Sequence, residues 1–129
     1  MKQRLVALTF CLAMFGVTAL EAHHSLAAEY DTKKPITLNG TITKVDWRNP
    51  HAWVYLDAKM ENGQIEKWQC ELGSPNAMTR AGFGPDSAKV GDQISLDGVL
   101  AKDGSKTCST RTVRAKDGHV LLSQTPGAR

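Results

Sequence analysis

Hydrophobic and polar residues alternate along the middle of the chain, as they do in half-buried β-strands. Over residues 36–43, isoleucine, leucine and glycine take one parity, and threonine and asparagine take the other. Val45 and Trp47 then fall on the opposite parity, which predicts a β-bulge near Lys44. A second alternating run over residues 51–59 places aliphatic side chains on one face and His, Trp, Tyr and Asp on the other.

Turn signals separate these runs from further strands. Asn62-Gly63 predicts a tight hairpin into a third strand. Asp-Gly pairs at 103–104 and 117–118 divide the second half of the chain in the same way. The expected strands there are 64–72, 93–101, 107–115 and a short final strand, 119–123.

One short helix is expected between the third and fourth strands. Ser74 has the character of an N-cap, and Pro75 suits the first helical position because it needs no amide donor there. Residues 76–81 continue the helix, and Gly82 ends it.

Three strands, a helix and two or three more strands follow the order of an OB-like fold, a small, partly open Greek-key β-barrel. A small β-sandwich is the alternative architecture. The expected domain covers residues 36–123, after a linker at 23–35 and before a disordered tail at 124–129. The expected core contains Ile36, Leu38, Ile42, Val54, Leu56, Trp68, Leu72, Ile94 and Leu96.

The first 22 residues have the layout of a secretory signal peptide. A basic start at 1–4 precedes an apolar run at 5–20, and small Ala22 closes the segment. The run is shorter than the ~20 residues that span a bilayer, so no stable membrane anchor is expected after cleavage. We predict a periplasmic protein that begins at His23, with cleavage after Ala27 or Ala28 as the alternative.

The length and net charge of the mature chain limit the kinds of binding partner that we expect. Cleavage leaves 107 residues (129 − 22), enough for one small domain, with a net charge of (16 − 2) − (13 − 1) = +2. The charges are interspersed and form no basic stripe, so no nucleic-acid partner is expected. A small ligand or a periplasmic protein is the expected partner.

Two cysteines remain after cleavage, because Cys11 lies in the leader. Cys70 and Cys108 could form a disulfide in an oxidising compartment, and the alternative is a pair of unbonded buried thiols. Cys108 has the opposite parity to Val113, so a bulge is needed if both cysteines point inward.

Five short segments of the chain form a recognisable set: His23-His24-Ser25, Ala28-Glu29-Tyr30-Asp31, Trp47-Arg48-Asn49-Pro50-His51-Ala52, Glu71-Leu72-Gly73-Ser74-Pro75-Asn76 and residues 101–105. With these segments the chain resembles an uncharacterised family of exported bacterial proteins that carry a domain of unknown function. The resemblance covers nearly the whole mature chain. It implies an exported small β domain and no particular activity.

Three histidines are candidate metal ligands. A free α-amine on His23, together with its ring, could bind a metal ion that His24 or His51 completes. Such a nitrogen-rich plane suits Cu(II) or Ni(II) better than zinc, and it resembles the histidine brace of copper proteins. The alternative is that His23 and His24 form a solvated tail and that His51 merely follows a turn.

A non-metal ligand surface is also predicted on the second strand. The Asn49-Pro50 turn presents His51 beside Trp53 and Tyr55, with Trp47 just before the turn. Strands two and three form the usual ligand surface of this barrel type. The alternative is that the turn sets the strand register and that the tryptophans belong to the core.

No serine lies in a nucleophile-elbow context, and no phosphate-binding loop is present in the sequence. We therefore expect a non-enzymatic exported domain that binds a small ligand or a partner protein. The alternative hypothesis is a copper-binding or copper-handling protein that uses the mature N-terminal histidines.

Overall fold

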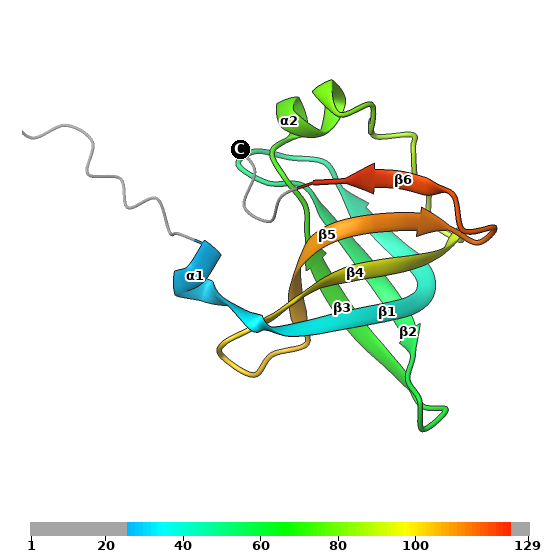
Figure 1. Ribbon diagram of the computed structural model, residues 1–129. Helices are drawn as coiled ribbons and strands as arrows, with labels where there is room; N and C mark the ends of the chain where they lie inside the picture. The colour runs from blue at the N-terminus through cyan, green and yellow to red at the C-terminus, as the bar shows by residue number, and fades with distance from the viewer. Residues whose placement is uncertain (1–25, 125–129) are drawn as a thin grey trace, which may run out of the picture.

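The computed structural model describes residues 26–124, and these form six strands and two short helices. The leader, its cleavage site, His23 and His24 lie outside the described residues. Figure 1 shows the elements in chain order: α1 (Leu26–Glu29), β1 (Tyr30–Asp46), β2 (Trp53–Lys59), β3 (Ile65–Glu71), α2 (Pro75–Arg80), β4 (Gln93–Ala101), β5 (Thr107–Ala115) and β6 (Val120–Ser123).

The strands form one sheet that closes on itself. Its order is β3-β2-β1-β4-β5-β6, and an additional pairing between β3 and β5 completes a ring. The β3–β5 pairing is parallel, and all the others are antiparallel. The predicted mainly β, OB-like architecture is confirmed, and the sandwich alternative is not found.

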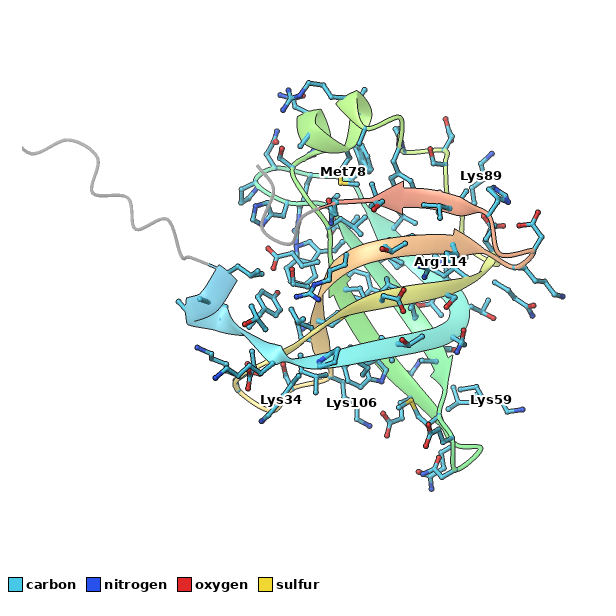
Figure 2. The ribbon with its side chains drawn as sticks, in the orientation of Figure 1. Lys34, Lys59, Met78, Lys89, Lys106 and Arg114 are labelled. Atoms are coloured by element: carbon cyan, nitrogen blue, oxygen red, sulfur yellow. The ribbon has the colours of Figure 1, made fainter. Side chains whose placement is uncertain are left out.

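The interior holds the residues that the alternation predicted. Val54 and Leu56 are each 1% exposed, and the rest of the predicted core is also buried, except Ile36, which is half-buried against it. Met78 points from α2 toward one end of the ring, where Phe83 is buried as well (Figure 2). The core therefore fills the ring and continues under the helix.

The N-terminal boundary differs from the prediction. Residues 26–29 form helix α1, and residues 30–35 belong to β1, so the expected linker at 23–35 is wrong over its described part. Tyr30 pairs with Ala101 and Pro35 with Val99 on β4, and the Lys102 amide donates to the Glu29 carbonyl at 2.9 Å. Most of these side chains are exposed, so the segment lacks strand-like alternation although its backbone is paired.

At the other end, Gln124 is held in place rather than forming part of a tail. Its amide donates to the Arg111 carbonyl at 2.8 Å, and its side-chain amide donates to the Thr110 carbonyl at 3.0 Å. Residues 125–129, the rest of the expected tail, lie outside the described residues.

The local predictions for the helix and the first bulge are confirmed. The Ser74 hydroxyl accepts from the Ala77 amide at 3.2 Å as an N-cap, and Gly82 follows the helix with φ +82°. In β1, the register against β2 shifts between Ile42 and Lys44. Within residues 26–124, no helix is long and apolar enough to cross a membrane.

Gly40 lies where β1 pairs with both β2 and β4, and we predict that it tolerates no side chain. A Cβ there would lie 2.5 Å from the Asp57 carbonyl oxygen and 2.9 Å from the Ala58 Cα, both backbone atoms. Gly40→Ala should lower the free energy of unfolding by about 1–3 kcal/mol, measured by urea denaturation. Gly84→Ala, which meets nothing within 4 Å, should stay within about 0.5 kcal/mol of the original protein. Equal losses in the two variants would contradict the prediction.

Candidate functional site

A carboxylate at the end of β3 joins side chains from two distant segments. Glu71, the last residue of β3, accepts a hydrogen bond on Oε2 from the hydroxyl of Tyr30, the first residue of β1. Its other oxygen, Oε1, contacts Nδ1 of His51 in the loop between β1 and β2. We call these three residues the His51–Glu71–Tyr30 cluster.

The β2–β3 ladder places His51 beside Glu71. Trp53 pairs with Glu71, and the ladder continues past the ends of both strands, where the Leu72 amide donates to the Ala52 carbonyl at 2.8 Å. The Ala52 amide in turn donates to the Gly73 carbonyl at 3.0 Å. His51 lies two residues before Trp53, so it points to the same side of the sheet. Its ring therefore lies on the outer face with Glu71.

Tyr30 is held in its neutral form. The residue is 4% exposed, and burial raises the pKa of its phenol well above the usual value, as does the hydrogen bond to Glu71. A neutral phenol donates to the carboxylate throughout the physiological pH range, so one oxygen of Glu71 is always occupied.

His51 keeps one ring nitrogen available. Its side chain is 24% exposed, against 12% for Glu71, and Nδ1 is engaged by the carboxylate. Nε2 makes no hydrogen bond to any residue in the described part of the chain. A carboxylate on one nitrogen fixes the orientation of the ring, an arrangement found at metal-bound histidines.

The predicted aromatic face is only partly on the outside. Trp53 and Tyr55 lie on the outer face of β2 and are half-buried, and the Lys44 ammonium sits 5.0 Å from the centre of the Tyr55 ring. Asn49 is exposed in the loop. Trp47 instead packs on the core, with its ring centroid 6.3 Å from that of Phe83, so it does not face the candidate ligand surface.

Two shallow grooves continue this outer surface. One of about 330 Å³ includes Tyr55 and Lys67, and another of about 610 Å³ includes Tyr30 and α1 residues. Both grooves are lined by Gln69, Ser105 and Thr107, so they adjoin along the pairing of β3 with β5, which we call the β3–β5 seam. We call the surface that the two grooves share the grooved face.

Three lysines of this surface are paired with carboxylates, whereas the Lys102 ammonium donates to the Ala27 carbonyl oxygen. Lys67 lies 3.5 Å from Asp57 and Lys44 lies 3.6 Å from Asp46. Lys106, at the end of the β4–β5 turn (Figure 2), lies 3.1 Å from Glu66, and this hydrogen bond is the main cause that lowers the pKa of Glu66. Local charge on the grooved face is therefore close to balanced.

The remaining candidates are placed as follows. Cys70 and Cys108 are buried and unbonded, and they are register partners across the β3–β5 seam. Among residues 26–124, no group of three or more His, Cys, Asp or Glu is gathered to hold a metal ion. A metal at His51 would therefore need ligands from outside the described part of the chain or from solvent.

Sequence reasoning missed two members of the cluster. The sequence pattern assigned Glu71 no role beyond its place in a family-like segment, and it placed Tyr30 in the expected linker at 23–35. A usable signal was present: the segments at 28–31, 47–52 and 71–76 that carry the family resemblance each supply one residue of the cluster.

Comparison with known proteins supports a family and leaves its role open. A family described as of unknown function, DUF6152, matches residues 11–110. No curated protein matches the sequence. Two crystal forms of the mitochondrial single-stranded DNA-binding protein Rim1 from S. cerevisiae are similar in structure, each with 8% sequence identity and a TM-score of 0.48. The matches cover 70% and 64% of this chain, and 96% and 92% of the respective yeast chains.

This comparison corrects one expectation. The absence of a basic stripe led us to expect no nucleic-acid partner, yet the similar structures belong to single-stranded DNA-binding proteins. The exclusion is therefore withdrawn. The likeness does not carry their binding function over to this chain.

We predict that Tyr30 makes the protein sensitive to alkali. Above about pH 10, the unfolded chain loses a phenolic proton that folded Tyr30 keeps, so stability falls as pH rises. Tyr30→Phe should flatten this decline, while costing about 1.5–3 kcal/mol near pH 7 through the lost hydrogen bond to Glu71. The free energy of unfolding, measured by urea denaturation from pH 7 to pH 11, checks both effects. Tyr55→Phe, which keeps the Tyr30–Glu71 bond, is the control, and an equal flattening there would refute the assignment.

Proposed function

This chain belongs to the DUF6152 family of unknown function, and we propose that it is an exported, non-enzymatic binding domain that holds Cu(II). In this proposal His51 is the ligand that the folded domain supplies. The α-amine and ring of His23, helped by His24, complete the site after the leader is removed.

The orientation of the His51 ring is the observation that carries the proposal. Glu71 holds Nδ1, Tyr30 holds Glu71, and Nε2 is left to bind a ligand. Metal-binding histidines characteristically donate their second ring nitrogen to a carboxylate or carbonyl. The other histidine of the described chain, His119, is bonded to Asp117 in an exposed turn at 2.5 Å. That pair has no third residue comparable to Tyr30.

The first strand of the described domain begins at this cluster. Tyr30 is itself part of the cluster, and only five residues separate it from His24. Five intervening residues span at most about 20 Å when extended, and α1 shortens that reach. The α-amine of His23 can therefore be delivered to the face that carries His51 without a long loop.

The donor set explains the choice of metal. An amine and two or three imidazoles form a nitrogen-rich set, and such sets favour Cu(II) in a planar arrangement. A single exposed imidazole would bind weakly, so the site requires the cleaved N-terminus.

A second candidate is a small ligand or partner protein on the grooved face. Its support is the continuous surface that runs from Tyr55 across Gln69 and Thr107 to Tyr30. The Gln69 side chain donates to the Thr107 hydroxyl at 2.8 Å, which gives this surface a fixed polar centre. Such a ligand would depend on Tyr55, whereas copper would not.

The first test is copper binding by the exported protein. We expect one Cu(II) per chain in isothermal titration calorimetry, with affinity falling below about pH 6.5 as protons compete for the imidazoles. His51→Ala, or one extra residue before His23, should lose most of the affinity. His119→Ala and Tyr55→Ala should keep it. Native mass spectrometry of the same sample fixes the first residue, and undiminished affinity in the extended chain would defeat the proposal.

A second test addresses the role of Glu71 in positioning His51. Glu71→Ala frees Nδ1 and should weaken copper binding by about 10- to 100-fold. Glu71→Gln keeps an oxygen acceptor but no charge, so it should fall between Glu71→Ala and the original protein. The electron paramagnetic resonance spectrum of bound Cu(II) reports whether the nitrogen ligands change. Full affinity and an unchanged spectrum in Glu71→Ala would show that the ring needs no carboxylate.

A further inference from the structure

The two cysteines of the described domain meet where the ring of strands closes. Cys70 in β3 and Cys108 in β5 are direct register partners, between the pairs Gln69–Thr107 and Glu71–Ser109. Both cysteines are 0% exposed and both belong to the hydrophobic core cluster. They are therefore on the inner side of the same two strands whose outer side carries Glu71.

A β-bulge in β5 allows Cys108 to face the core, where Cys70 also lies. Asp97 of β4 pairs with Thr112, but the next residue, Gly98, pairs with Thr110, so Arg111 is the extra residue of β5. The extra residue reverses the parity between Val113 and Cys108, and both side chains face the core. The bulge that the cysteine parity required is present.

The spacing suits a covalent bond. Neighbouring strands lie about 4.8 Å apart, and disulfides join residues whose Cα atoms are about 4.4–6.8 Å apart. The thiol of Cys108 is the main cause that raises the pKa of the Cys70 thiol, ahead of burial, which agrees with their place as register partners inside the ring. Gly98 makes room for them, since a Cβ there would lie 3.3 Å from the Cys108 sulfur.

We propose that Cys70 and Cys108 form a disulfide that locks the β3–β5 seam of the ring. The oxidant is a disulfide, either a small molecule or a thiol-oxidising protein. One cysteine thiolate attacks a sulfur of the oxidant, which forms a mixed disulfide and releases one thiol. The second cysteine then displaces the second thiol, so the oxidant gains two electrons and two protons and the protein loses them.

Burial sets the order of events. In the closed ring neither thiol is exposed, and the neighbouring Cys108 thiol together with burial raises the pKa of the Cys70 thiol, so the mixed disulfide cannot form there readily. Oxidation therefore takes place before β5 docks on β3, or when that seam opens. This inference is independent of copper binding.

The test compares two ways of oxidising the same protein. The reduced chain is exposed to oxidised glutathione while folded or during refolding from urea, then denatured and alkylated. Peptide mass spectrometry distinguishes Cys11 from the other two cysteines. We expect a Cys70–Cys108 cross-linked peptide after refolding, and much slower cross-linking of the folded sample.

The melting temperature distinguishes a disulfide that stabilises the ring from an oxidation that does not. The bond closes a loop of 37 intervening residues (108 − 70 − 1), so the oxidised form should have a higher melting temperature than the reduced form. The double variant C70A/C108A should show no change on oxidation. Alkylatable Cys70 and Cys108 after refolding with oxidant, or an oxidised form that melts lower, would overturn the proposal.

Discussion

The structure depends on closure of the ring between β3 and β5. Only three residue pairs make that parallel contact, and the backbone bond from the Gln69 amide to the Lys106 carbonyl, at 3.1 Å, anchors its start. Side chains alternate along a strand, so consecutive positions of β3 serve opposite sides of the ring. Cys70 faces the core, and Glu71 faces outward toward His51 and Tyr30. One short pairing thus positions both the sulfur pair and the candidate binding site.

Glu71 also makes three distant segments depend on one another. A carboxylate that is only 12% exposed loses much of its hydration, and its oxygens then need partners from the protein. Tyr30 satisfies one oxygen and His51 the other. The start of β1, the loop before β2 and the end of β3 are therefore held in mutual register by a single side chain. The same arrangement leaves Nε2 of His51 as the group with unused binding capacity.

Bulges and close-packed glycines let this small sheet close. The bulge in β1 falls between its pairing with β4 and the far end of its pairing with β2, and the bulge in β5 falls opposite Gly98. Cβ atoms at Gly40 or Gly98 would lie 2.5 Å from backbone oxygens, closer than side chains are found. Strands that bend this sharply can enclose a core with few residues, because each serves two neighbours.

The sequence by itself determined the strands, the helix, its cap and most of the core. These features depend on neighbours within a few residues: alternation, the Asn62-Gly63 turn, and Ser74 before Pro75. It also indicated that Cys70 and Cys108 needed a bulge to meet, because parity is a local property. Only the tertiary structure decided that residues 30–35 belong to β1 and that Tyr30, His51 and Glu71 form one cluster. His51 is 20 positions from Glu71 along the chain, and Tyr30 is 41 positions from it. Their contacts with Glu71 arise from ring closure and from the pairing of β1 with β4, which no local pattern encodes.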